Sequence, residues 1–252
     1  MQSLIEKQDF GRFLILGIAF LILFFANIFL ILNTNFEYNF WILLPLFFVS
    51  IYLADFTSGI LHFIVDFTPC KKGVGLDKLF YFEGKRDSDE YRKMRMEIMK
   101  KAGVFQHFVY FFKHHHLVSP ANIARRSAFT TFLPTIPISS GYFLINFILL
   151  ILNINAPHLI FTFFATGVIV LFAQYIHSCT HGRKYIPSAI RFLQNIGLVL
   201  SVRKHILHHK DPTKYFCFVN GWADPLVNFI TAKLVSVGIY SESGLSAPEK
   251  EF

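Results

Sequence analysis

The sequence predicts an all-α integral membrane protein with four transmembrane helices and a cytoplasmic helical cap. Three observations lead to this prediction. Of the 252 residues, 54% are hydrophobic and 32 are Phe. The mean hydropathy is +0.47. The apolar runs are also longer than a globular core helix needs, since a bilayer core about 30 Å thick requires about 20 apolar residues per helix.

Four segments are long and apolar enough to span a bilayer. They are residues 13–32, 40–60, 129–152 and 158–176. The first is not expected to be a signal peptide, because its apolar run is too long and no small-residue cleavage site follows it. We expect residues 1–252 to form one membrane-embedded domain.

The basic residues predict the orientation in the membrane. Cytoplasmic loops are rich in Lys and Arg, whereas short translocated loops lack them. The connectors 33–39 and 153–157 contain neither residue. Both termini and the polar segments 67–128 and 177–252 are therefore expected on the cytoplasmic side of a bacterial inner membrane or the endoplasmic reticulum. This rule and anionic lipid account for the formal charge of +8, and no sequence signature of nucleic-acid binding accompanies the charge.

Eight of the 11 histidines fall into four tight groups. The groups are His62; His115 and His116; His177 and His181; and His205, His208 and His209. At 1.5 Å per residue, His62 lies about 33 Å from the start of its span and His177 about 30 Å from the start of its own. Both therefore lie near the inner membrane edge, where the other groups can join them. Unpaired imidazoles near lipid are costly, which favours a metal site.

The spacing within the groups favours two metal ions. Residues four apart share a helical face, as His177 and His181 do, and as His62 and Asp66 do. Adjacent residues point about 100° apart on a helix, so His115 and His116 would serve different ions or an ion and its outer shell.

Three histidines stand outside this set. His114 could replace either neighbour as a ligand. His107 and His158 are interpreted as hydrogen-bonded core residues.

The second span also carries a polar stripe at steps of four, three and four residues. Its members are Asp55, Gly59, His62 and Asp66. A carboxylate at Asp55 is costly inside lipid, so it is expected to be functional or paired with a partner. The alternative is a helix contact through Ser58 and Gly59.

Four motifs resemble the Kua family of membrane lipid desaturases, whose members include plasmanylethanolamine desaturase. They are ADFTSGILHFIVD (54–66), HHLVSP (115–120), HSCTH (177–181) and RKHILHHKDPTKYFCFVNGWADPL (203–226). The last motif is the most specific, because its histidines are followed in order by Pro212, a Tyr-Phe-Cys run and a Gly-Trp pair. The resemblance implies that the eight grouped histidines are the family's metal ligands and that Asp66 is its catalytic HxxxD aspartate. Two departures are the three residues between His116 and Pro120, and Arg126 in place of a further histidine.

The resemblance also implies the reaction. A 1-alkyl ether phospholipid (plasmanylethanolamine) would be oxidised by dioxygen to the 1-alkenyl ether (plasmalogen) at two Fe²⁺ ions. Such chemistry needs a redox metal that the protein positions and shields. The chain has no dinucleotide-binding fingerprint, so an external donor such as cytochrome b5 or a ferredoxin, with its reductase, would supply electrons.

Three alternatives remain at this point. The first is a fatty-acyl or acyl-lipid desaturase or hydroxylase with the same metals. The second is a haem-binding membrane electron carrier, although haem would leave many histidines unused. The third is a scaffold that has lost its chemistry.

Two further segments are open to interpretation. The charge-dense segment 67–104 is interpreted as a solvated cytoplasmic helix or lid, or as a helix resting on the membrane surface. Arg183, Arg203 and Lys204 could contact a lipid phosphate, although ordinary cytoplasmic charge would look the same.

Overall fold

The computed structural model describes residues 3–37, 39–70, 72–116, 131–132, 134–181 and 186–241. Within these ranges the chain is helical and contains no strand. The long helices are α1 (Ser3–Leu32), α2 (Phe40–Phe67), α8 (Ile136–Ile151) and α9 (Pro157–Thr180). The shorter elements are η1 (Lys72–Val74), α3 (Leu76–Phe80), α4 (Asp89–Met99), α5 (Val104–His115), α10 (Ser188–Asn195), α11 (Val202–Lys210) and α12 (Asp224–Ser236).

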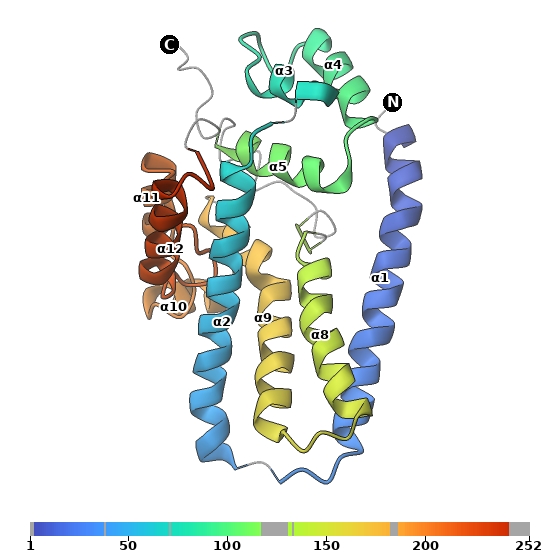
Figure 1. Ribbon diagram of the computed structural model, residues 1–252, viewed down its shortest axis with the longest axis vertical. Helices are drawn as coiled ribbons and strands as arrows, with labels where there is room; N and C mark the ends of the chain where they lie inside the picture. The colour runs from blue at the N-terminus through green and yellow to red at the C-terminus, as the bar shows by residue number, and fades with distance from the viewer. Residues whose placement is uncertain are drawn as a thin grey trace.

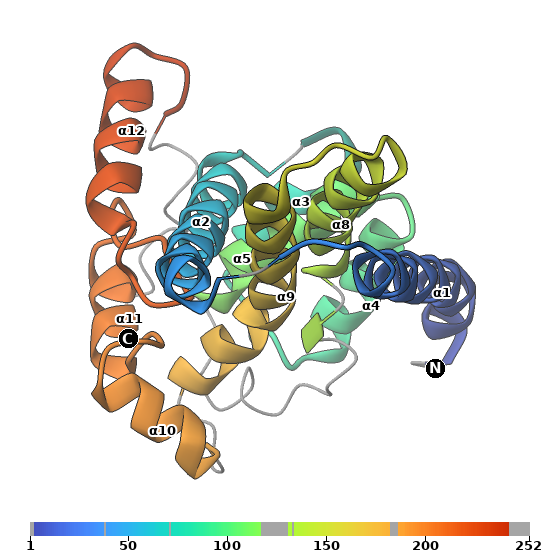
Figure 2. The ribbon, with the colours of Figure 1, turned by 90° about the horizontal axis from the view of Figure 1, so that it is seen from below.

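The four long helices form an elongated bundle (Figure 1). Helix α1 packs on α8, α8 on α9, and α9 on α2. The connectors from α1 to α2 and from α8 to α9 lie together at one end, and α3, α4 and α5 lie at the other (Figure 1). Seen from below, α12, α11 and α10 follow one another along one side of the bundle, with α12 packed on α2 and α11 on α9 (Figure 2).

In the part of the chain that the structure describes, three helices are long and apolar enough to cross a membrane. Their spans are Leu14–Leu32, Phe40–Phe67 and Pro157–Thr180. Three of the predicted segments, 13–32, 40–60 and 158–176, thus lie on such helices, and α2 continues seven residues beyond the predicted end. The fourth, 129–152, contains α8, which has only 16 residues. At 1.5 Å per residue α8 is about 24 Å long, shorter than a bilayer core.

Small residues and buried polar groups join the long helices. Gly167 of α9 lies so close to α8 that an added Cβ would be 3.0 Å from the ring of Phe143. One turn earlier in α8, the Ser139 hydroxyl donates to the Gly167 carbonyl at 2.7 Å. Helix α1 is joined to α8 by a hydrogen bond of 3.1 Å from Asn146 Nδ2 to Asn27 Oδ1. Close approach through small residues and interhelical hydrogen bonds are typical of membrane bundles.

The segment 67–104 forms a small helical cap against α5. Its apolar side chains Tyr91 and Ile98 are buried in a core with Tyr110 of α5. The Arg86 guanidinium donates to the carbonyls of Leu79 and Phe80 at 3.0 and 2.8 Å and so satisfies the end of α3. These apolar residues therefore pack inside the cap instead of resting on a membrane surface.

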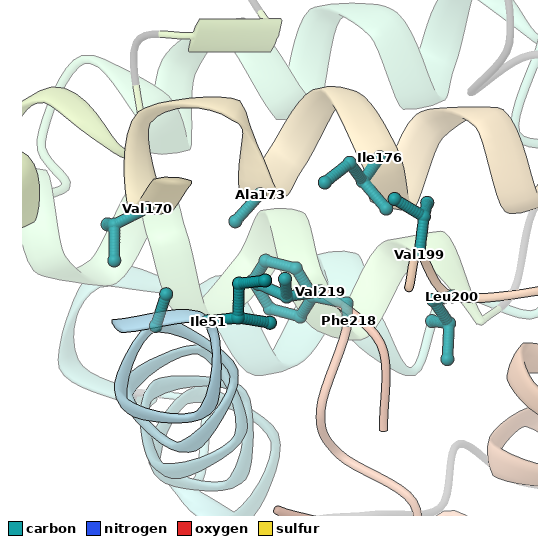
Figure 3. Close-up of a cluster of buried hydrophobic side chains, with 9 residues drawn as sticks. Ile51, Val170, Ala173, Ile176, Val199, Leu200, Phe218 and Val219 are labelled. Atoms are coloured by element: carbon teal, nitrogen blue, oxygen red, sulfur yellow. The ribbon is translucent and has the colours of Figure 1, made fainter. Parts of the chain in front are cut away.

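Residues 216–220, in the loop between α11 and α12, are buried against the bundle. Figure 3 shows the side chains of Phe218 and Val219 among Ile51 of α2 and Ala173 and Ile176 of α9. A backbone hydrogen bond of 2.7 Å joins the Val219 carbonyl to the Leu200 amide. This loop thus belongs to the core next to the histidines.

Candidate metal centre

The C-terminal ends of α2 and α9 meet α5 and α11 at the capped end of the bundle. The structure brings all eight predicted histidines and Asp66 together there, from all four sequence groups. Seven of these histidines and Asp66 divide into two sets of four potential metal ligands. Within each set the four donor atoms lie within 4.8 Å of one another.

The first set lies between α5, α9 and α11 and contains four imidazoles. Its members are His115, His181, His205 and His209. The Nε2 atom of His205 lies 2.9 Å from that of His181 and 3.0 Å from that of His209. The Nε2 atoms therefore converge on one small volume, as four ligands of one ion would.

The second set combines three imidazoles with a carboxylate. Its members are His62, Asp66, His116 and His208. Asp66 Oδ2 lies 3.2 Å from His62 Nε2 and 3.4 Å from the Nε2 atoms of both His116 and His208. The side chain predicted to be catalytic is thus placed as a fourth potential ligand.

The two sets adjoin, because neighbouring residues of α5 contribute to each. The ring centroids of His115 and His116 are 4.1 Å apart, yet His115 belongs to the first set and His116 to the second. The adjacent histidines thus fall into different sets, and their binding to different ions, or to an ion and its outer shell, stays a prediction. His177 lies beside the first set, with its Nε2 atom 3.1 Å from that of His181 and 3.2 Å from that of His205.

The remaining histidines lie outside both sets. His114 packs on the ring of Tyr110, with centroids 5.2 Å apart. His107 Nε2 is 2.9 Å from the Met99 carbonyl at the end of α4, which fits the predicted hydrogen-bonded role. The predicted core position of His158 is wrong, because this residue is exposed where α9 begins and the connector leaves its ring uncovered.

Backbone carbonyls hold the far side of several imidazole rings. His62 Nδ1 donates to the Phe216 carbonyl and His208 Nδ1 to the Lys214 carbonyl, each at 2.8 Å. His115 Nδ1 is similarly bonded to the Phe112 carbonyl. A proton fixed on Nδ1 leaves the Nε2 lone pair directed into the site, which is the arrangement that a metal-ligating histidine needs.

Burial favours the neutral form of four imidazoles, those of His115, His205, His208 and His209. It lowers the pKa of His115 and His205 well below the usual value, assisted by neighbouring histidines. Burial likewise lowers the pKa of His208 to about 4 and that of His209 to about 2. Neutral imidazole is the form that binds a metal ion.

The donor set fits two metal ions. The Nε2 atom of His115 and the Oδ1 atom of Asp66 are buried without a hydrogen-bond partner. Buried polar atoms are normally satisfied, so these atoms point to a ligand. Imidazole suits iron, zinc, copper and nickel, and eight donors exceed the four of a tetrahedral zinc site.

Sequence reasoning missed the carbonyls of Phe216 and Lys214, because every residue carries a carbonyl and no sequence pattern marks these two. The predicted contacts of three basic residues with a lipid phosphate stay a prediction. Lys204 Nζ donates to the Asn220 carbonyl at 3.2 Å, Arg203 is exposed, and Arg183 lies outside the described residues. Pro120 and Arg126 likewise lie outside them.

Comparison with known proteins supplies the family. A family model described as a lipid desaturase domain matches residues 89–235, more than half of the chain. The chain belongs to this lipid desaturase family. The matched region includes seven of the eight predicted histidines and excludes α2, which carries His62 and Asp66.

Two plant proteins show limited similarity to this chain. Fatty acid desaturase 4, chloroplastic, of Arabidopsis thaliana is 32% identical over 79 residues, and fatty acid desaturase 4-like 2, chloroplastic, of the same plant is 34% identical over 79 residues. Each alignment covers 30% of this chain and 24% or 28% of the relative. The chain thus spans about a quarter of the length of these relatives. No solved structure matches it.

Proposed function

We propose that this protein is a membrane lipid desaturase with two iron ions held by the two sets of ligands. The observation that carries the proposal is the pairing of two adjoining four-donor sets, built from a chain of the lipid desaturase family. The iron ions would supply the oxidising power that no side chain has. The eight histidines, including His177 as a further ligand of the first set, and Asp66 would hold them.

The reaction removes two hydrogens from adjacent carbons of a lipid chain. The substrate loses two C–H bonds and gains a C=C bond. Dioxygen accepts the two hydrogens together with two external electrons and two protons, and forms two molecules of water. The electrons would come from cytochrome b5 or a ferredoxin with its reductase.

The position of the site fits an amphiphilic substrate. His62 and His177 lie at the ends of two apolar helices, so a lipid head group could stay at the interface while its upper chain reaches the metals. The short connectors at the opposite end lack Lys and Arg. This asymmetry supports a multi-pass orientation with both termini and the metal centre in the cytoplasm, in a bacterial inner membrane or the endoplasmic reticulum.

The proposed substrate is a 1-alkyl ether phospholipid, which would become the 1-alkenyl ether. The support is the segment 203–226, whose GWADPL ending resembles the plasmalogen-forming branch of the Kua family. A fatty-acyl or acyl-lipid chain is the second candidate, favoured by the names of the two plant relatives.

Lipid analysis of plasmalogen-deficient cells that express this chain tests the proposal. Acid-labile 1-alkenyl phospholipid should form with the wild type and be absent with His205→Ala, a change that leaves Asp66 and its partners intact. Failure in cells that contain iron-loaded protein would refute the ether substrate. New double bonds in acyl chains would then identify the second candidate, and an intense Soret band in the purified protein would favour haem binding instead.

A further inference from the structure

A buried carboxylate in the middle of α2, that of Asp55, binds the backbone of the loop between α11 and α12. Asp55 is completely buried and accepts four backbone hydrogen bonds from one segment. The donors to Oδ1 are the amides of Val219, Asn220 and Gly221, at 3.0, 2.8 and 3.1 Å, and the donor to Oδ2 is the Ala223 amide at 2.9 Å. Hydrogen bonds to an ionised group are stronger than neutral ones, so Asp55 fixes the course of this loop.

The next turn of α2 extends the same attachment. Ser58 Oγ accepts a hydrogen bond from the Phe218 amide at 3.1 Å. Gly59 allows close approach of the loop, because a Cβ at this position would lie 2.5 Å from Cys217 Sγ. The stripe on α2 therefore has two parts, of which the first holds the loop and the second, His62 and Asp66, belongs to the metal centre.

The other end of this loop orients two imidazoles. The Phe216 and Lys214 carbonyls accept the Nδ1 protons of His62 and His208, and both histidines belong to the second set. Tyr215, between the two carbonyls, has a φ of 61°. An L-residue in this left-handed conformation is unfavourable, so the attached surroundings must hold it there.

Among the hydrogen bonds of the described residues, none joins an imidazole of the first set to residues 214–224. His115 Nδ1 is bonded to the Phe112 carbonyl within α5, and His177 Nδ1 lies 3.4 Å from Gln174 Oε1 within α9. The loop therefore orients imidazoles of the second set only, through its hydrogen bonds to His62 and His208.

We propose that Asp55 is a positioning residue for the second metal set. By anchoring the loop 214–224 it holds the two carbonyls that keep His62 and His208 directed at the ion. The inference rests on the proposed function only in requiring that both sets bind metal. A purely structural Asp55 would lower stability without a selective effect on one ion.

The test compares metal affinity in two single-site backgrounds. His205→Ala removes a central ligand of the first set, and His208→Ala removes one of the second. Asp55→Asn is added to each. The asparagine side chain has the size of the aspartate, but its NH2 group replaces an oxygen that accepts hydrogen bonds from backbone amides. Co²⁺ binding to the purified full-length chain is measured by its absorption and by competition with a chelator.

The proposal expects selective loss. Asp55→Asn should weaken Co²⁺ binding about tenfold or more in the His205→Ala background, the usual cost of losing an outer-shell partner. It should change binding less than about twofold in the His208→Ala background. Asn27→Leu is the matched control, since it removes a buried polar link between α1 and α8 and should leave both affinities unchanged.

Two results would overturn the proposal. The first is that Asp55→Asn weakens Co²⁺ binding equally in both backgrounds. The second is that Asn27→Leu weakens Co²⁺ binding as much as Asp55→Asn does. If Asp55→Asn does not accumulate, Ser58→Ala removes one bond to the same loop and should weaken the second set in the same direction. No change with that milder variant would also overturn it. A wild-type chain that binds fewer than two ions would refute the proposed function itself, an outcome distinct from unselective weakening.

Discussion

Substitution of Gly59 by alanine probes the contact between α2 and the loop that follows α11. The added Cβ would lie 2.5 Å from Cys217 Sγ and 3.0 Å from a methyl group of Val227. Ordinary van der Waals contact begins at about 3.4 Å, so the loop or the helix must move by about 1 Å. Cys217, which the added methyl group would displace, is the neighbour in sequence of Phe216, whose carbonyl orients His62.

Gly59→Ala should destabilise the fold because it adds a methyl group where no space is free. Such substitutions destabilise a protein by about 1–3 kcal/mol. For a chain of this size each kcal/mol lowers the melting temperature by about 2–4 °C. We therefore expect Gly59→Ala to unfold about 2–12 °C below the wild type in thermal scans of the detergent-purified protein.

Two further variants make the assay specific. Gly141→Ala places the same methyl group in α8, where no atom lies within 4 Å, and should not lower the melting temperature. Cys217→Ala removes the clashing sulfur, so the Gly59→Ala and Cys217→Ala double variant should recover part of the loss, as a coupled pair does. Wild-type stability of Gly59→Ala, or a double variant whose losses simply add, would refute this reasoning.

The remaining predictions concern the metals and pH. Iron-loaded wild-type protein should contain two ions per chain by elemental analysis, and His205→Ala and His208→Ala should each retain one; a single variant that loses both ions would show that the sets are not independent. Without metal, stability should fall as pH decreases from about 6.5 to about 4, because burial lowers the pKa of His208 to about 4 and the unfolded chain then binds more protons. His208→Gln should reduce this slope in melting temperatures measured across pH, and an unchanged slope would contradict the assignment.

The apolar helices and the convergence of the histidines were predictable from sequence because both depend on regular spacing. Counting residues along α2 and α9 was enough to place His62 and His177 at one depth, and the alternation at His115 and His116 indicated two sets. These inferences need only the rise and turn of a helix. The metal assignments themselves remain predictions.

Features that depend on irregular backbone could not be predicted in the same way. The length of α8 and the path of the segment after α11 are set by tertiary contacts. Asp55 was expected to have a function or a partner, yet its partners are four amides more than 160 residues away in sequence. Backbone amides carry no side-chain signal, so only the fold reveals the pairing.

The amide pair between α1 and α8 has a consequence for the order in which the bundle assembles. Asn27 Nδ2 donates to the Leu23 carbonyl of its own helix at 2.8 Å and to the Phe143 carbonyl at 3.0 Å, while its oxygen accepts from Asn146. One amide proton is thus satisfied as soon as α1 forms, whereas the other groups wait for a helix synthesised 119 residues later. Sliding α1 by one turn would break the two hydrogen bonds that Asn27 makes with α8 and would leave these groups unsatisfied in hydrocarbon. These two hydrogen bonds fix the height and rotation of α1 against α8, so they can form only after α8 has been synthesised.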